Sequence, residues 1–354
     1  MTSPSTSGRA ARTSRLLSGA PAPAGPDRVP PIGGEGPGAA RIAVDLLGGD
    51  NAPAVVVDGA LQALRADPDL HLLLVGPPEA THGLFAMLGV AERHRVTVRP
   101  VQHGIRMADD PRGAARPGNT VRAAVAAVGS GEADAFVSAG STGASVTAAA
   151  LELGRWPQVR HPALVATVPA VDGPVVLLDV GGSMEPRPAA LAHHALLGSA
   201  FAAVGHGVAG PRVGLLSVGT ETGKGDPARR AADPLLSALT LPRDGRYVGL
   251  VEGYDVCVGG RADVVVTDGF TGNVLLKAIE GAYAMAGGPP AYGSAPRAAA
   301  LLGVGGTAVV CHGAATAADV ASGIALAAHL HRRRAVPVIS GLLAELIGSQ
   351  EVTA

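Results

Sequence analysis

The sequence has few aromatic residues, few charged residues and almost no cysteine, and each shortage excludes a class of protein. Aromatic residues make up 3% of the 354 residues and charged residues 16%, and the formal net charge is −1. Because binding to a nucleic-acid backbone needs an excess of Lys and Arg, we expect no nucleic-acid partner. Cys257 and Cys311 lie far apart, and no secretory signal indicates an oxidising compartment. We interpret both as reduced core residues.

Long apolar runs are also absent. No stretch of roughly 18 uncharged apolar residues predicts a membrane span, and no apolar segment follows the arginines at positions 9, 12 and 15 as in a signal peptide. We therefore expect a soluble, cytoplasmic protein. Residues 1–40 are rich in Ser, Pro, Gly and Ala, which cannot bury enough apolar surface to fold. We interpret them as a disordered tail, with a targeting peptide as the alternative.

Short apolar segments alternate with Ala- and Leu-rich segments from residue 41 to residue 348. We expect strands at 42–47, 71–76, 95–101, 134–139, 163–168, 174–179, 212–218, 263–267 and 307–311, and helices at 53–66, 79–90, 119–130, 143–154, 187–204, 228–238, 272–285, 314–331 and 337–347. Strands that are apolar throughout and alternate with helices predict an α/β domain with a mainly parallel sheet covered on both faces. The Gly- and Pro-rich segment 286–296 is the clearest internal break.

Six strand ends carry glycines and polar residues, and ligands of such sheets bind beyond the carboxyl ends of the strands. We expect the six to meet at one edge. The first segment contains Asp45, Gly48, Gly49 and Asp50. Its glycines allow a close approach of the backbone, and its carboxylates suit a metal, the orientation of a lysine or the cap of the next helix.

The second segment, residues 137–144, is a turn that enters a helix through Gly140, Ser141, Thr142 and Gly143. Backbone N–H groups, two hydroxyls and a helix N-terminus together suit an anion such as phosphate. Ordinary capping by Ser141 or Thr142 is the alternative.

The third and fourth segments follow the same plan. The third runs from its strand into Gly181 and Ser183. In the fourth, Lys224 stands between glycines three residues after Glu221, where it approaches an anionic ligand freely or is simply solvated.

The fifth and sixth segments hold the remaining candidate residues. The fifth contains Asp268, Thr271 and Asn273 and enters a helix that carries Lys277. Asn273 is either a site residue or the cap of that helix. In the sixth, His312 follows an apolar strand and is either a general acid or base or a capping histidine. The chain has no CxxC, HExxH or GxSxG signature, so metallopeptidase and serine-hydrolase readings lack support.

In this order the segments resemble the phosphate acyltransferases of the PlsX family. The family's D-x-M/L-G-G-D motif matches residues 45–50, its V-S-A-G-N-T-G-A motif matches 137–144 except at Ser141, and its D-G-F-T-G-N motif is intact at 268–273. The match covers about residues 41–332. It implies a three-layer fold like that of phosphotransacetylase and isocitrate dehydrogenase. It also implies transfer of a fatty acyl group from acyl-carrier protein to inorganic phosphate, which supplies phospholipid synthesis, by a homodimer without cofactor or metal.

The chain departs from the family pattern at several loops. Ser141, Ser183 and Ser217 replace asparagines, and Thr222 stands where a second acidic residue is common. These changes predict an altered affinity or substrate choice. The family's long helical excursion shrinks to residues 286–291, which are too short for an amphipathic interfacial helix. We therefore expect weak or absent membrane association.

The chemistry of this reaction and the placement of the candidate residues at strand ends suggest roles for them. We expect phosphate in the turn Gly140 to Gly143, with positive charge from Lys224 and Lys277. Asn273 and His312 are candidates for stabilising the oxyanion or protonating the leaving thiolate, and Asp45, Asp50 and Asp268 for orienting them.

Two other activities remain open: a phosphotransacetylase-type enzyme that uses coenzyme A, and a non-catalytic descendant that binds phosphate or acyl ligands. Acyl-carrier protein is acidic, and the one contiguous basic run is 332–334. We interpret this run as a solvated helix end rather than a docking surface.

Overall fold

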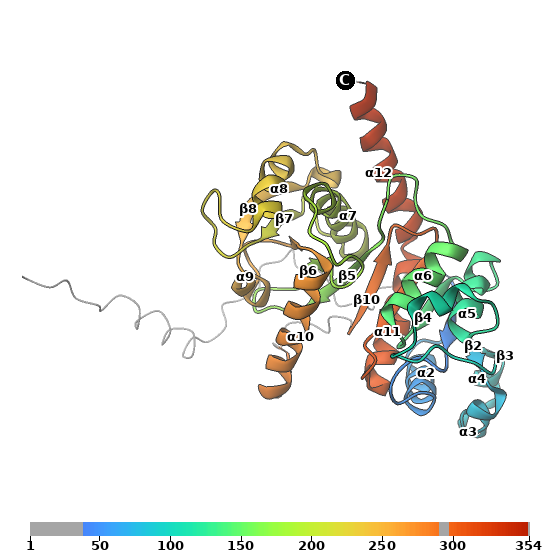
Figure 1. Ribbon diagram of the computed structural model, residues 1–354. Helices are drawn as coiled ribbons and strands as arrows, with labels where there is room; N and C mark the ends of the chain where they lie inside the picture. Colours follow the sequence, from blue (N-terminus) through green and yellow to red (C-terminus); the bar gives the residue numbers. More distant parts are fainter. Residues whose placement is uncertain (1–37, 290–296, 353–354) are drawn as a thin grey trace, which may run out of the picture. The chain divides into compact units, whose positions relative to one another are not determined.

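The computed structural model describes residues 38–289 and 297–352, and its strands form one sheet (Figure 1). The sheet has 11 strands in the order β3-β2-β1-β4-β11-β10-β5-β6-β9-β7-β8. The strands are β1 Ala40–Asp45, β2 Leu70–Gly76, β3 Val96–Pro100, β4 Ala135–Ser138, β5 Ala163–Val168, β6 Val175–Leu178, β7 Arg212–Leu216, β8 Arg246–Val251, β9 Val264–Val266, β10 Ala298–Leu302 and β11 Thr307–Cys311. The expected tail lies outside the described residues except for 38–40, and so does most of the break at 286–296.

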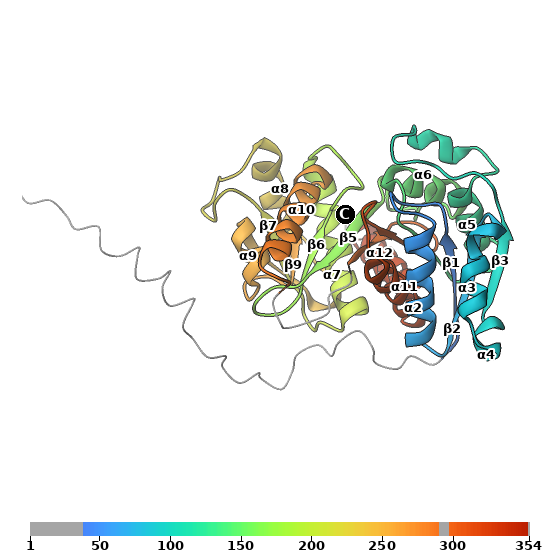
Figure 2. The same cartoon turned by 90° about the horizontal axis from the view of Figure 1, so that it is seen from below.

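Helices cover both faces of this sheet. They are α2 Ala54–Ala66, α3 His82–Met87, α4 Val90–Arg93, α5 Thr120–Gly129, α6 Thr142–Glu152, α7 Pro188–His206, α8 Pro227–Ala238, α9 Gly253–Val258, α10 Gly269–Met285, α11 Ala317–Arg332 and α12 Ala335–Val352. The 3₁₀ helices are Pro78–Thr81, Pro111–Ala115 and Pro242–Asp244. One apolar cluster joins α2, α7, α11 and α12 to the sheet, and the other joins α5, α6, α9 and α10. Figure 2 shows β6 and β9 between α7 and α10.

The alternation of side chains along the strands fills these two clusters. In β4, Val137 packs into the first cluster and Phe136 into the second, as the period of two requires. Because both faces are covered, strands such as β5 and β11 are buried along their whole length. The predicted three-layer α/β fold is confirmed.

Strand direction divides the sheet into two halves. β1, β2, β3, β4 and β11 run parallel to one another, and so do β6, β7, β8 and β9. Between them β10 is antiparallel to both β11 and β5, and β5 is antiparallel to β6. The two halves therefore run in opposite directions. We call the edge where β1, β4 and β11 end the first edge, and the edge where β6, β7 and β9 end the second edge.

Several predicted elements differ from the structure. The single helix expected at 79–90 is divided into a 3₁₀ turn, α3 and α4, and the sequence patterns missed β8, α9 and β10. β10 consists of three alanines and two leucines, which favour a helix on propensity. Pairing on both of its sides makes it a strand instead. β8 is polar and partly exposed at the end of the sheet, where the apolar signal of a strand is weak.

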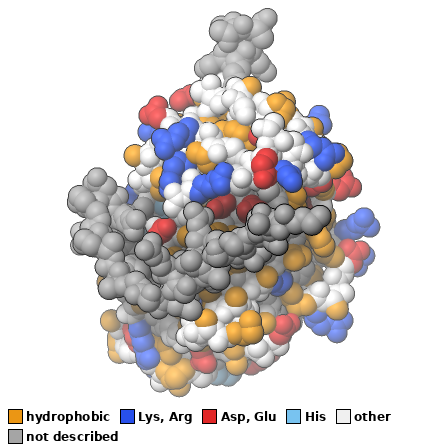
Figure 3. Space-filling view, turned by 90° about the vertical axis from the view of Figure 1, so that its left-hand side faces the viewer, with side chains coloured by type: hydrophobic (Ala, Val, Ile, Leu, Met, Phe, Trp, Pro, Cys, Tyr) orange, Lys and Arg blue, Asp and Glu red, His pale blue; other side chains and the backbone are white. Residues whose placement is uncertain are grey.

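Cys257 and Cys311 are both free thiols. Cys311 is buried as expected, whereas Cys257 is only half-buried, so its assignment to the core is wrong in part. Among the described residues no helix is long and apolar enough to cross a membrane. On the face seen in Figure 3, basic, acidic and apolar side chains are interspersed, in keeping with the net charge of −1.

Candidate active site

Asp45 at the end of β1 organises the first edge. Its buried carboxylate accepts hydrogen bonds from Ser138 Oγ at 2.7 Å and from the backbone N–H of Leu47 at 3.1 Å. Burial raises the pKa of Asp45. A Cβ at Gly48 would lie 2.6 Å from the carboxylate, so only glycine fits there. Asp45 thus orients the turns around it.

The second segment packs directly on this carboxylate. The N–H of Gly140 donates to Ser138 Oγ at 2.9 Å, and Ser141 caps α6 by accepting from the N–H of Ala144 at 3.4 Å. Thr142 and Gly143 are the first two residues of α6. The capping interpretation of Ser141 is therefore confirmed, and the N-terminus of α6 stands at the first edge beside Asp45.

The sixth segment joins the first at the same edge. The N–H of Asp50 donates to the carbonyl of Gly313 at 2.8 Å, and Gly49 lies close to the carbonyls of Ala139 and Gly313. Three of the six predicted segments, those around Asp45, Ser141 and His312, thus meet here.

The third and fifth segments meet at the second edge, around Asp179. The buried carboxylate of Asp179 accepts from the backbone N–H groups of Gly181 at 3.0 Å and Gly182 at 2.7 Å. It also accepts from the N–H and hydroxyl of Ser183 at 2.7 and 2.9 Å. Sequence reasoning placed Gly181 and Ser183 in the site but missed Asp179, which folds their loop. Its position directly after an apolar strand was the available signal.

Asp268 begins the fifth segment as the N-cap of α10. Its carboxylate accepts from the N–H and hydroxyl of Thr271 at 2.9 and 2.8 Å, and from a guanidinium nitrogen of Arg229 at 2.7 Å. Although burial raises the pKa of Asp268, the hydrogen bonds from Thr271 and Arg229 outweigh it and the pKa is lowered. Arg229 is buried and also donates to Thr267 Oγ1 and to the carbonyl of Leu216. Arg229 was not predicted from the sequence, because nothing in its helical sequence context indicates a site residue.

Asn273 ties the start of α10 to the third segment. Its amide nitrogen donates to the carbonyl of Val180 at 3.1 Å. A Cβ at Gly272 would lie 1.9 Å from the carbonyl oxygen of Asp179, so α10 approaches this loop as closely as a glycine allows. Asn273 lies inside the helix, so its interpretation as a helix cap is wrong; Asp268 has that place.

Lys224 stands in the fourth segment, after β7 at the second edge. In the described part of the chain its ammonium has no acid partner. Glu221 packs near Gly219, and its carbonyl accepts from the N–H of Lys224 at 3.1 Å. Lys224 is thus a cation available to a ligand.

Helix α10 links the two edges. Lys277, two turns into the helix, has its Nζ 3.5 Å from His312 Nδ1, and Glu280 Oε1 lies 2.9 Å from His312 Nε2. The expectation that all six segments share one edge is wrong, because the sheet reverses direction at its centre. Helix α10 joins the third and fifth segments at the second edge to His312 of the sixth segment at the first edge. Glu280 was not predicted; its spacing of three residues from Lys277 was the signal.

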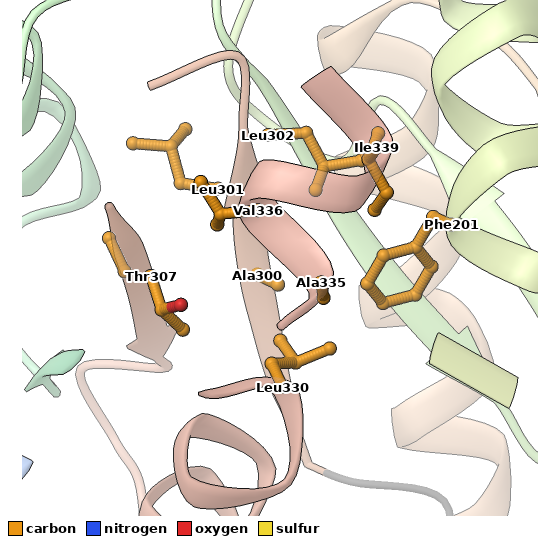
Figure 4. A pocket seen from close by; sticks show the side chains of 10 residues that line it. Phe201, Ala300, Leu301, Leu302, Thr307, Leu330, Ala335, Val336 and Ile339 are labelled. Carbon is orange, nitrogen blue, oxygen red and sulfur yellow. The ribbon is translucent and has the colours of Figure 1, made fainter. Parts of the chain in front are cut away.

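Two hollows are present among the described residues. One, lined by residues 103–119, has a volume of about 580 Å³. The other, of about 10 Å³, lies beneath α12 among mostly apolar side chains, including Phe201, Leu330 and Ile339 (Figure 4). Since it barely holds one water and offers that water little to bond to, it is a packing gap. Among the described residues no group of three or more His, Cys, Asp or Glu could hold a metal.

Solved structures with a similar fold include a phosphotransacetylase and a branched-chain phosphotransacylase. A phosphotransacetylase from Streptococcus pyogenes superimposes with a TM-score of 0.59 at 19% identity, covering 83% of this chain and 94% of that one. A branched-chain phosphotransacylase from Enterococcus faecalis gives 0.58 at 16% identity, covering 82% and 99%. At this level of identity the likeness establishes the fold alone.

Sequence comparison establishes the family. Residues 40–288 match the family model described as a fatty acid synthesis protein. The phosphate acyltransferase of Thermobifida fusca is 39% identical over 320 residues, which cover 82% of this chain and 87% of that protein. That of Bacillus mycoides is 42% identical over 244 residues, covering 68% and 71%. The chain therefore belongs to the PlsX family of phosphate acyltransferases and is an acyltransferase.

Proposed function

We propose that this acyltransferase takes a fatty acyl group from acyl-carrier protein, transfers it to inorganic phosphate and so supplies acyl phosphate for phospholipid synthesis. A phosphate oxygen attacks the carbonyl carbon of the thioester, the C–S bond breaks, and the carrier leaves as a thiolate that takes up a proton. No covalent bond to the protein is needed. Its tasks are to hold phosphate against the carbonyl and to stabilise the developing oxyanion.

In the turn from Gly140 to Gly143, the hydroxyls of Ser141 and Thr142 and the N–H groups that follow Gly140 suit the phosphate, because the N-terminus of α6 favours an anion. Lys224 and Lys277 supply positive charge. His312 receives its orientation from Glu280 and protonates the leaving thiolate. Asn273 stabilises the oxyanion, and Asp268 holds the first turn of α10 in place for it.

The contact of α10 with both edges is the observation that carries this proposal. Its first turn bonds to the loops of the second edge through Asp268 and Asn273, and its third turn meets His312 at the first edge. One helix thereby connects Arg229 and the loop after β6 at the second edge with His312 at the first edge. Such an arrangement suits a reaction that joins two separately bound substrates.

The test is the formation of acyl phosphate from acyl-acyl-carrier protein and inorganic phosphate, followed by mass spectrometry and by release of the free carrier thiol. We expect turnover that depends on phosphate. Acyl-coenzyme A serves as the parallel donor. Faster turnover with acyl-coenzyme A would indicate a phosphotransacetylase-type enzyme. Tight binding of phosphate without turnover from either donor would refute the proposal and favour a non-catalytic descendant, in keeping with the departures at Ser141, Ser183, Ser217 and Thr222.

We further propose a cytoplasmic homodimer that works without a cofactor and associates weakly or not at all with membranes. α10 ends at Met285, and residues 286–289 form no further helix; 290 and 291, the rest of the shortened segment, lie outside the described residues. Strong binding of the purified protein to lipid vesicles would contradict the last point.

A further inference from the structure

The hollow of about 580 Å³ opens in the segment that joins β3 to α5. Its volume lies within the range of about 300–1,000 Å³ typical of small-molecule sites. Among the residues that line it are His103, Asp109, Asp110, Arg112 and Arg116. None of these has a role in the mechanism above.

The charges of the hollow leave two cations free. Asp109 is paired with Arg106 at 3.2 Å, and Asp110 Oδ1 accepts from the backbone N–H of Arg112 at 2.9 Å. The guanidinium groups of Arg112 and Arg116, by contrast, have no acid or carbonyl partner within residues 38–289 and 297–352. Two free guanidinium forks suit the oxygens of a phosphate group.

The wall of the hollow packs on the first edge. A Cβ at Gly313 would lie 2.8 Å from Met107 Cε, and one at Gly143 would lie 2.9 Å from Pro111 Cγ. Gly104 likewise abuts the side chain of Leu47. The segment that carries Arg112 and Arg116 therefore contacts the anion-binding turn and the loop of His312. A ligand in the hollow is thus next to the proposed reaction centre.

Both candidate donors carry the acyl group on the same chemical arm. In acyl-carrier protein and in coenzyme A the thioester sulfur ends a pantetheine chain whose other end is a phosphate ester. When the thioester is at the reaction centre, this phosphate must lie some distance outside it. An exposed hollow beside the centre, with two guanidinium groups that are unpaired among the described residues, provides that place. The substrate phosphate, in contrast, needs a site against the carbonyl where water is excluded.

We propose that the hollow lined by residues 103–119 binds the phosphate of the donor's phosphopantetheine arm, with Arg112 and Arg116 as its ligands. This assignment rests on the proposed function, because it presupposes a thioester donor. It also predicts that the protein prefers phosphorylated donors over a pantetheine thioester that lacks the phosphate.

The test compares wild type with the double variant Arg112→Gln/Arg116→Gln. Arg333→Gln is the control, since Arg333 is exposed at the end of α11, next to Arg332, which pairs with Asp67 beyond the opposite edge. Calorimetry measures binding of 4′-phosphopantetheine and of pantetheine. We expect wild type to bind the phosphorylated compound at least about tenfold more tightly, the double variant to lose this difference and the control to keep it. In turnover, the ratio of kcat/KM for acyl-coenzyme A over acyl-pantetheine falls by a similar factor.

Each possible outcome supports or overturns the assignment of the hollow. Equal binding of the two compounds by wild type, or an undiminished preference in the double variant with an unchanged circular dichroism spectrum, overturns the assignment. A similar loss with acyl-acyl-carrier protein and acyl-coenzyme A shows that the phosphate itself is recognised; a loss confined to the carrier protein makes that protein the source of the arm. If no donor gives acyl phosphate while phosphopantetheine binding still depends on the two arginines, the proposed function fails, and the hollow remains a site for the phosphate of phosphopantetheine but not for that of an acyl donor.

Discussion

At the scale of single residues, Glu280 fixes the orientation of His312. Its carboxylate oxygen lies 2.9 Å from Nε2, and the ring is thereby held with Nδ1 facing the ammonium of Lys277 at 3.5 Å. We expect Glu280→Ala to lower kcat on the order of tenfold, as the loss of one hydrogen bond to a charged group implies, with little change in KM for phosphate. Glu280→Gln, which still accepts from Nε2, should retain most of the activity. Equal losses in both variants, with Glu79→Ala as an exposed control, would show that Glu280 acts in another way.

The ion pair of Arg229 and Asp268 is a second residue-scale device, and it lies out of contact with water. Arg229→Met leaves a buried carboxylate unpaired, which costs roughly 3–5 kcal/mol of unfolding free energy at pH 7. The folded-state pKa of Asp268 is lowered, so the pair stabilises the protein above the unfolded-state pKa of about 4 and this contribution disappears as the pH falls through the folded-state value. Urea unfolding of wild type and Arg229→Met should therefore show that the difference between their unfolding free energies, the gap, closes below about pH 4. A gap that stays constant down to pH 3 would contradict this account.

At the scale of elements, the sequence located α10 but not its beginning. The pattern predicted a helix from 272, because Asp268, Gly269 and Gly272 read as a loop, whereas the structure makes Asp268 the N-cap. Glycines weaken a helix, but here one of them lets the helix touch the neighbouring loop. β10 was missed for a related reason. Its alanines favour a helix, but pairing with distant strands overrode this local preference. Strands such as β2 and β11 were predictable because burial on both faces leaves a continuous apolar run.

Two glycines of α10 test this explanation. Gly272→Ala places a Cβ 1.9 Å from the carbonyl oxygen of Asp179, so we expect the unfolding free energy to fall by several kcal/mol. Gly281, further along the same helix, has nothing within 4 Å of its would-be Cβ. Gly281→Ala should therefore raise the unfolding free energy by about 0.5–1 kcal/mol. Denaturant titration of the two variants measures both effects. A Gly272→Ala protein as stable as wild type would show that the close approach is not needed.

At the scale of the whole molecule, the sequence identified the functional segments but not their arrangement. Alternating strands and helices predict a parallel sheet and say nothing of where it reverses. The reversal arises at the β5–β6 hairpin and at β10, a strand that was missed, and it assigns Lys224 and Asp268 to one edge and His312 to the other. Only the geometry of α10 shows which of these side chains touch.

This arrangement predicts which residues depend on one another. Lys277 and His312 are in contact at 3.5 Å, so removing either side chain disables the same unit. The double variant Lys277→Met/His312→Gln should therefore lose little more kcat/KM than the more damaging of the two single variants. Lys224 has no contact with His312. The loss of transition-state stabilisation in Lys224→Met/His312→Gln should therefore equal the sum of the losses in the two single variants within about 0.5 kcal/mol. Values of kcat/KM for all single and double variants give both coupling energies. Additive losses in the first cycle would mean that the Lys277–His312 contact does not serve the reaction. A strong coupling between Lys224 and His312 in the second cycle would mean that residues of the two edges act as one site although they are not in contact.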